Sequence, residues 1–123
     1  MDAGSEADED WAGIVPFYYG RWDEAAQAHA REDDRQCNYE AGDRYPAEGA
    51  FDPPATLAAL AALKAPVLLL AGELDGGPRP AAAARMATFF PTATVHVLPG
   101  AGHFPWLDDP AHFSGVIAEF LSR

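Results

Sequence analysis

Two short apolar segments, each closed at once by a glycine-rich turn, constrain the fold of this chain more than any other feature. Residues 67–71 (Val-Leu-Leu-Leu-Ala) are apolar at every position and run into Gly-Glu-Leu-Asp-Gly-Gly at 72–77. Residues 94–98 (Thr-Val-His-Val-Leu) run into Pro-Gly-Ala-Gly at 99–102. A strand without polar positions is typical of burial on both faces of a parallel sheet. The connection between the segments is long enough for a right-handed crossover, so we predict two parallel strands.

Helical patterns surround both strands. Several of these helical patterns begin with an acid that is followed by a proline or by a second acid, and such residues suit helix N-termini. We predict helices at 23–38, 52–65, 79–89 and from 108 to the C-terminus, and an irregular stretch at 39–49. The last helix carries an apolar stripe at helical spacing, formed by Phe113, Val116, Ile117, Phe120 and Leu121. The order helix, strand, helix, strand, helix indicates an α/β fold, with the first strand in need of a neighbour on its other edge.

Composition narrows the class of protein. The 123 residues hold 19 acids and 8 bases, a formal charge of −11, which argues against nucleic acid and anionic membranes as partners. A single cysteine, Cys37, excludes an internal disulfide and favours a reducing compartment. The N-terminus lacks the pattern of a signal peptide, and no apolar run approaches the roughly 18 residues of a membrane span. We therefore expect a soluble, cytoplasmic protein.

Asp75 and His103 are the candidate catalytic residues. Each follows the carboxyl end of a predicted strand, where ligands and reacting groups gather in open α/β sheets. A carboxylate beside an imidazole can fix its tautomer and stabilise the imidazolium that forms when the ring takes a proton. A metal site built from His103, Asp108 and Asp109 is an alternative. We prefer to interpret the two aspartates as helix caps, so no metal and no cofactor is expected.

The residues that surround this pair resemble a known family. Pro-Val-Leu-Leu-Leu-Ala-Gly-Glu-Leu-Asp at 66–75, followed by Leu-Pro-Gly-Ala-Gly-His-Phe-Pro-Trp-Leu-Asp-Asp-Pro at 98–110, is similar to the C-terminal third of an α/β-hydrolase. The resemblance implies that Asp75 is the triad acid and His103 the triad histidine, for hydrolysis of a small-molecule ester or amide. It also implies a helical cap-like segment at 11–55 and the C-terminal portion of the hydrolase sheet at 56–123. Residues 1–10 are mostly small and acidic, so we expect a disordered tail there. The aromatic stretch at 17–23 resembles caps of proline-iminopeptidase-like members.

The sequence departs from the family at the nucleophile. Such enzymes attack with a serine on a Gly-x-Ser-x-Gly turn, and Ser5, Ser114 and Ser122 all lack that surrounding pattern. Cys37 lacks it too. Because the family places the serine before the acid, we expect this chain to be the C-terminal part of a longer hydrolase or the product of a truncated reading frame, and to be poorly stable alone. The alternative is a non-catalytic fragment or interaction module with a hydrolase-like core. Substrate and oligomeric state stay open.

Overall fold

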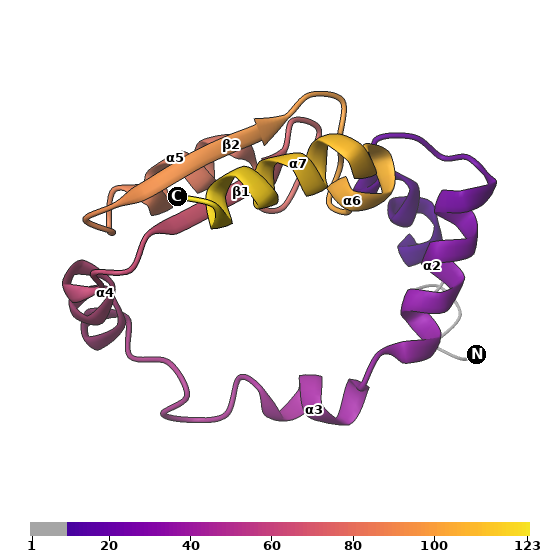
Figure 1. The fold of residues 1–123 in the computed structure, drawn as a ribbon. Helices are drawn as coiled ribbons and strands as arrows, with labels where there is room; N and C mark the ends of the chain where they lie inside the picture. The colour runs from indigo at the N-terminus through magenta and orange to yellow at the C-terminus, as the bar shows by residue number, and fades with distance from the viewer. Residues whose placement is uncertain (1–9) are drawn as a thin grey trace.

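A computed structural model of the chain describes residues 10–123. The predicted disordered tail at 1–10 lies outside this range, except that Asp10 opens a helical stretch at 10–14. The elements that follow are η1 (Val15–Tyr18), α2 (Glu24–Gln36), α3 (Tyr39–Arg44), α4 (Pro53–Ala62), β1 (Val67–Gly72), α5 (Pro80–Ala87), β2 (Ala93–Leu98), α6 (Pro105–Asp108) and α7 (Pro110–Leu121) (Figure 1). None of the helices in the described range has the length and apolar character needed to cross a membrane.

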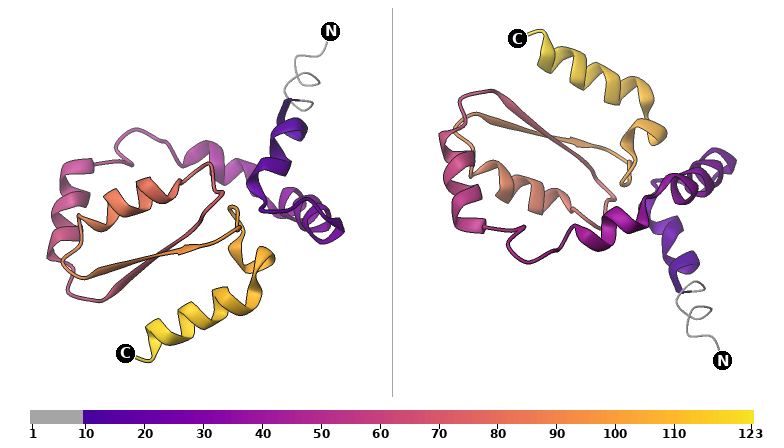
Figure 2. Two further views of the ribbon diagram at one scale, coloured as in Figure 1. Left: turned by 90° about the horizontal axis from the view of Figure 1, so that it is seen from above. Right: turned by 90° about the horizontal axis from the view of Figure 1, so that it is seen from below.

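The predicted sheet is confirmed. β1 and β2 pair in parallel, in register from Val67 opposite Ala93 to Gly72 opposite Leu98, and α5 forms the crossover between them. Helices α5 and α7 lie on opposite sides of the strand pair (Figure 2). This arrangement gives the fold class expected from the sequence, α/β with two parallel strands and flanking helices.

Polar caps explain where most helices begin. Asp23, Asp52 and Asp109 each accept a hydrogen bond, 3.0 Å long, from the backbone N–H three residues on, at the starts of α2, α4 and α7. Asn38 does the same for α3. The prediction of an irregular stretch at 39–49 is therefore wrong for residues 39–44. We missed Asn38 as a cap, and a Glu40–Arg44 ion pair one turn apart adds support along this helix.

The interpretation of Asp108 as a helix cap is also wrong. Asp109 alone caps α7, whereas Asp108 ends the short helix α6, which the sequence pattern did not predict. Pro105 at the start of α6 sets the backbone angle that a first helical turn requires. The carboxylate of Asp108 is thereby free to bind elsewhere.

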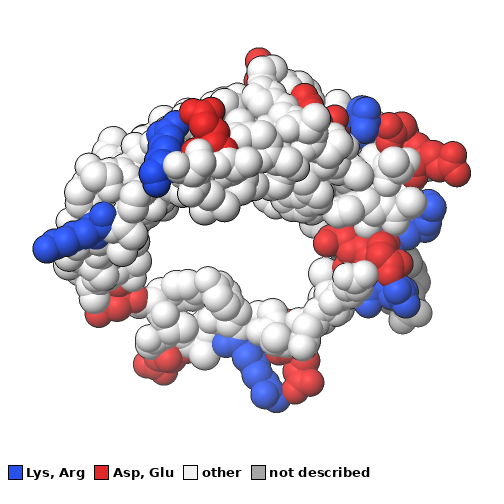
Figure 3. Space-filling view, viewed as in Figure 1, with Lys and Arg blue, Asp and Glu red and all other residues white. Residues whose placement is uncertain are grey.

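Burial is limited and uneven. Leu98 and Ala101 are fully buried and Tyr19 nearly so, all close to the carboxyl ends of the strands. Residues 31–66, in contrast, are exposed except for the half-buried Leu60. This segment, with α3 and α4, forms an arc away from the sheet (Figure 1), and an opening remains between the arc and the rest of the chain (Figure 3). Residues 67–70 of β1 are only half-buried, so the expected burial on both faces is wrong here, because the arc does not cover the strand.

Candidate active site

The turn after β1 and the loop after β2 bring Asp75 and His103 together, as the sequence predicts. Nδ1 of His103 lies 3.0 Å from Oδ2 of Asp75. The turn is closed by a hydrogen bond from the N–H of Asp75 to the carbonyl of Gly72, 3.2 Å long. Asp75 is 7% exposed, and its other oxygen, Oδ1, accepts a 2.9 Å hydrogen bond from the N–H of Gly77. Both oxygens of this buried carboxylate are therefore hydrogen-bonded.

This geometry assigns the protonation of the imidazole. An ionised carboxylate only accepts hydrogen bonds, so Nδ1 of His103 carries the proton that joins it to Asp75. In the neutral ring Nε2 then holds a free lone pair. The His103 side chain is 35% exposed, which leaves the ring reachable from outside. The arrangement can accept a proton at Nε2 and stabilise the positive charge that results.

The glycine-rich turns are tied to each other. The N–H of Leu74 donates to the carbonyl of Ala101 over 2.9 Å, and the N–H of Gly100 donates to Oε2 of Glu73 over 2.8 Å. A Cβ at Gly72 would lie 2.1 Å from the carbonyl oxygen of Gly102, so the strand must end in a glycine where the loop crosses it. These bonds fix the separation of the two turns that carry Asp75 and His103.

The last residue of η1, Tyr18, lies directly against the histidine loop. The N–H of His103 donates to the carbonyl of Tyr18 over 2.6 Å. The rings of Tyr18 and Phe104 both lie edge to face with the imidazole of His103, with centroids 5.5 Å and 5.2 Å from it. Phe104 in turn contacts Trp106, with ring centroids 5.5 Å apart.

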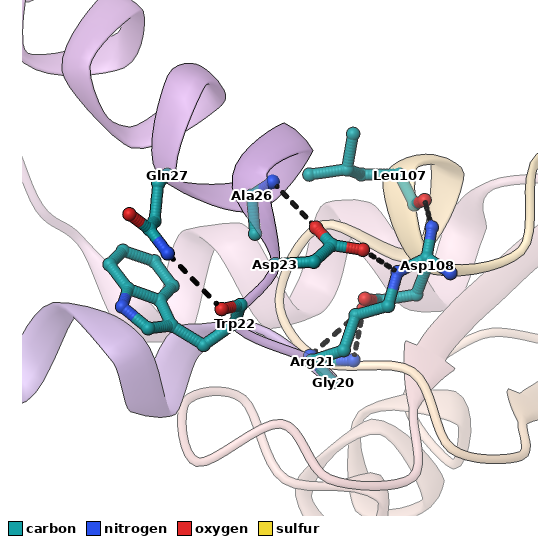
Figure 4. Close-up of polar contacts among 9 residues, drawn as sticks. Gly20, Arg21, Trp22, Asp23, Ala26, Gln27, Leu107 and Asp108 are labelled. Atoms are coloured by element: carbon teal, nitrogen blue, oxygen red, sulfur yellow. Dashed lines mark hydrogen bonds and ion pairs between the residues drawn. The ribbon is translucent and has the colours of Figure 1, made fainter.

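Asp108 joins these two segments, a role the sequence analysis missed. Its Oδ2 accepts hydrogen bonds from the N–H of Gly102 at 2.8 Å and from the N–H of Gly20 at 3.1 Å. Next to it, Arg21 donates to the carbonyl of Leu107 over 3.1 Å and pairs with Asp23 (Figure 4). The sequence held one signal for this role, the adjacent acids Asp108 and Asp109. Only one of them can cap α7, so the other must bind elsewhere.

A pocket of about 530 Å³ opens beside His103. Aromatic rings form much of its wall, and Trp11 and Tyr18 contact each other at 5.9 Å between centroids. The remaining lining includes Val15, Tyr19, Ala30, Asp33, Asp34, Cys37, Tyr39 and Phe104. Burial, with smaller contributions from the carboxylates of Asp33 and Asp108, raises the pKa of Tyr19, whose hydroxyl lies 2.9 Å from Nδ1 of His29. The charged side chains of this lining are acidic.

The other candidate groups form no hydrogen bond with the Asp75–His103 pair among the described residues. Ser114 is exposed on α7, and the Ser122 hydroxyl donates to the carbonyl of Glu119. Cys37 is an exposed free thiol on the pocket wall. His96 and His112 contact each other on the outer side, Nε2 to Nε2 at 3.2 Å. Within residues 10–123 no three potential metal ligands gather, so the alternative of a site from His103, Asp108 and Asp109 gains no support.

The sequence model of a family described as the alpha/beta hydrolase family matches residues 2–113. The match spans most of the chain and includes both Asp75 and His103. A search of the curated proteins found no match.

Proposed function

The chain belongs to the alpha/beta hydrolase family, and from that premise we propose that Asp75 and His103 are the acid and the histidine of a Ser-Asp-His triad for ester or amide hydrolysis. The observation that carries this proposal is the 3.0 Å contact between Nδ1 of His103 and the buried carboxylate of Asp75. It combines an oriented imidazole, an available Nε2 and a fixed anion, which are the requirements of a general base in acyl transfer.

In this proposal His103 takes the proton of the attacking hydroxyl at Nε2. The carbonyl carbon of the substrate forms a bond to that oxygen, and the imidazolium then gives the proton to the leaving alcohol or amine. Water repeats the sequence to release the acid from the acyl-enzyme. Asp75 keeps the ring in the Nδ1–H form and stabilises the imidazolium throughout. The reaction needs no cofactor.

The substrate of this proposal is a small ester or amide. The pocket beside His103 is of a size that suits small molecules, and its aromatic wall suits an apolar acyl or alcohol group. Asp33 and Asp34 line the same pocket, which disfavours anionic substrates. The exposed thiol of Cys37 is consistent with a cytoplasmic location, and the acid excess with neither nucleic acid nor membrane as a partner.

We place the attacking serine outside the 123 residues, on a further strand of the sheet that β1 and β2 begin. The N–H groups of Val67 and Glu73 donate toward the β2 side, to Thr92 and Leu98. Backbone groups of a strand alternate in direction, so Leu68 and Leu70 direct theirs to the opposite edge. Within the described residues that edge has no partner strand. A nucleophile turn at the end of an added parallel strand would approach the pocket from the carboxyl end of the sheet.

Two measurements on the purified chain test the proposal. The first is the tautomer of His103, obtained from the ring ¹⁵N shifts: we expect the Nδ1–H form in the unmodified chain and its loss in Asp75→Ala. Glu119→Ala removes the same charge at an exposed position on α7 and keeps the acceptor of the His103 proton, so it should leave the tautomer unchanged. A tautomer that does not respond to Asp75→Ala contradicts the triad assignment.

The second measurement is turnover of p-nitrophenyl butyrate. We expect background hydrolysis, equal in the unmodified chain, His103→Ala and Cys37→Ala, and no serine labelled by a fluorophosphonate probe. Turnover above background that His103→Ala abolishes would contradict the placement of the nucleophile outside these residues. In that event loss of activity in Cys37→Ala would identify the thiol as the attacking group. Background turnover together with an unresponsive tautomer would instead favour the non-catalytic module.

A further inference from the structure

We propose that Asp108 is a positioning residue for the histidine of the pair: it clamps the loop that carries His103 to residues 18–20 and so holds the imidazole in line with Asp75. This inference rests on the proposed function of His103. It starts from the fact that Asp108 does not cap a helix, because Asp109 accepts the capping bond at the start of α7. Its carboxylate instead faces two backbone N–H groups from distant parts of the chain.

The two hydrogen bonds to Asp108 come from the two segments that meet here, the histidine loop and residues 18–20. Gly102 donates to Oδ2 of Asp108 over 2.8 Å, and Gly20, which belongs to the segment before α2, donates to the same oxygen over 3.1 Å. Hydrogen bonds from N–H groups to a carboxylate are stronger than those between neutral groups. One oxygen therefore joins the histidine loop to the segment that carries Tyr18.

The next peptide group is fixed by the same segment. The N–H of His103 donates to the carbonyl of Tyr18 over 2.6 Å. Consecutive N–H groups of the loop, at Gly102 and His103, are thus both held, one by Asp108 and one by the segment that Asp108 clamps. Because both of these N–H groups are hydrogen-bonded, the backbone at His103 is fixed. Its side chain therefore approaches Asp75 from a defined direction, as an oriented base requires.

The fit at this junction is backbone against backbone. A Cβ at Gly20 would lie 2.2 Å from the carbonyl oxygen of Gly100, and a Cβ at Gly102 would lie 2.5 Å from that of Tyr18. The two segments therefore approach each other as closely as their backbones allow. The other oxygen of Asp108, Oδ1, is buried and has no hydrogen-bond partner among the described residues. The carboxylate is therefore held in place through Oδ2 alone.

The test compares Asp108→Ala, Asp108→Asn and Asp109→Ala with Asp75→Ala, using the His103 tautomer in the whole chain as the readout. We expect Asp108→Ala to lose the Nδ1–H form. Asp108→Asn should retain it, because the amide oxygen can accept both N–H groups. Asp109→Ala, which removes a neighbouring acid and a helix cap, should also retain it. A purely structural role would make Asp109→Ala and Asp108→Ala alike in this readout.

The outcomes separate this inference from the proposed function. If Asp75→Ala changes the tautomer and a folded Asp108→Ala does not, the positioning role is overturned and the triad assignment stands. If neither changes it, the triad assignment itself fails. If circular dichroism shows that Asp108→Ala does not fold, amide exchange in the unmodified chain tests the positioning role of Asp108 instead. The clamp requires slow exchange of the Gly20 and Gly102 protons, and fast exchange of either overturns it.

Discussion

Replacement of Gly102 by alanine should separate residues 18–20 from the histidine loop. The added Cβ would lie 2.5 Å from the carbonyl oxygen of Tyr18 and 2.7 Å from the nitrogen of Gly20, whereas ordinary contact begins at 3.4 Å. Both neighbours are backbone atoms and cannot turn aside as a flexible side chain would. Relief of the overlap therefore breaks the contact between the two segments.

The cost follows from the bonds that this contact holds. The hydrogen bond from His103 to Tyr18 contributes about 1 kcal/mol, and the bond from Gly20 to the charged Asp108 about 1.5–3 kcal/mol. Their joint loss, about 2.5–4 kcal/mol, corresponds to an opening equilibrium raised on the order of 100-fold. Gly102→Ala should accelerate amide exchange of His103 by that factor.

Native-state hydrogen exchange followed by NMR measures this effect, with Gly76→Ala as the matched control. Gly76 lies beside Asp75, has open space where a Cβ would be added, and does not have a positive φ. Its replacement should leave the exchange of His103 within a fewfold of the unmodified chain. Equal exchange rates in Gly102→Ala and the unmodified chain would refute the contact between the two segments and the clamp built on it.

Two further predictions concern the core and the pocket wall. Leu98 is fully buried at the end of β2, so Leu98→Ala should lower the free energy of unfolding, measured in urea, by about 2–5 kcal/mol. Leu121 is 74% exposed, so Leu121→Ala should change that free energy little. Equal effects of the two substitutions would contradict the described core. The hydrogen bond from the Tyr39 hydroxyl to Asp34 raises the pKa of Tyr39 to about 12, so Asp34→Asn should return it toward 10.0, as followed by the ¹³Cζ shift. The pKa of Tyr39 is higher in the folded chain than in the unfolded chain, so this bond stabilises the folded chain fully below pH 10. Its contribution is lost as the pH rises through about 12. A Tyr39 pKa that Asp34→Asn leaves unchanged would show that the bond does not form.

The sequence was sufficient for features set by local chemistry. A short apolar run predicts a strand, and an acid before prolines predicts the start of a helix. The strands β1 and β2 and the helices α4 and α7 all lie where these patterns occur. Asp75 and His103 were predicted to meet because the carboxyl ends of parallel strands lie at one edge, and they do. The likeness of residues 17–23 to proline-iminopeptidase caps stays a prediction.

What the sequence did not give depends on contacts between distant segments. The pairing of Asp108 with Gly20 spans 88 positions, and no periodicity or propensity reports such a contact. α3 was missed for a different reason: we took Asn38 as the last residue of the helix at 23–38 and 39–49 as irregular, whereas Asn38 caps a new helix. The half-burial of β1 is a different case, because the sequence predicted that this strand needs a neighbour on its other edge, although it did not predict how exposed residues 67–70 would be.

The contrast between a poorly covered sheet and a well-connected site has one physical explanation. Burial of β1 requires apolar surface from many residues, and the arc at 31–66 does not supply it. The orientation of His103, in contrast, requires a few short polar bonds, and the residues that make them (Gly20, Asp75, Gly77, Asp108 and the carbonyl of Tyr18) all belong to this chain. An added strand along β1 would therefore change stability far more than the geometry of the Asp75–His103 pair. The tautomer of His103 should already be fixed before any such strand binds, which makes it the more direct observable of the site.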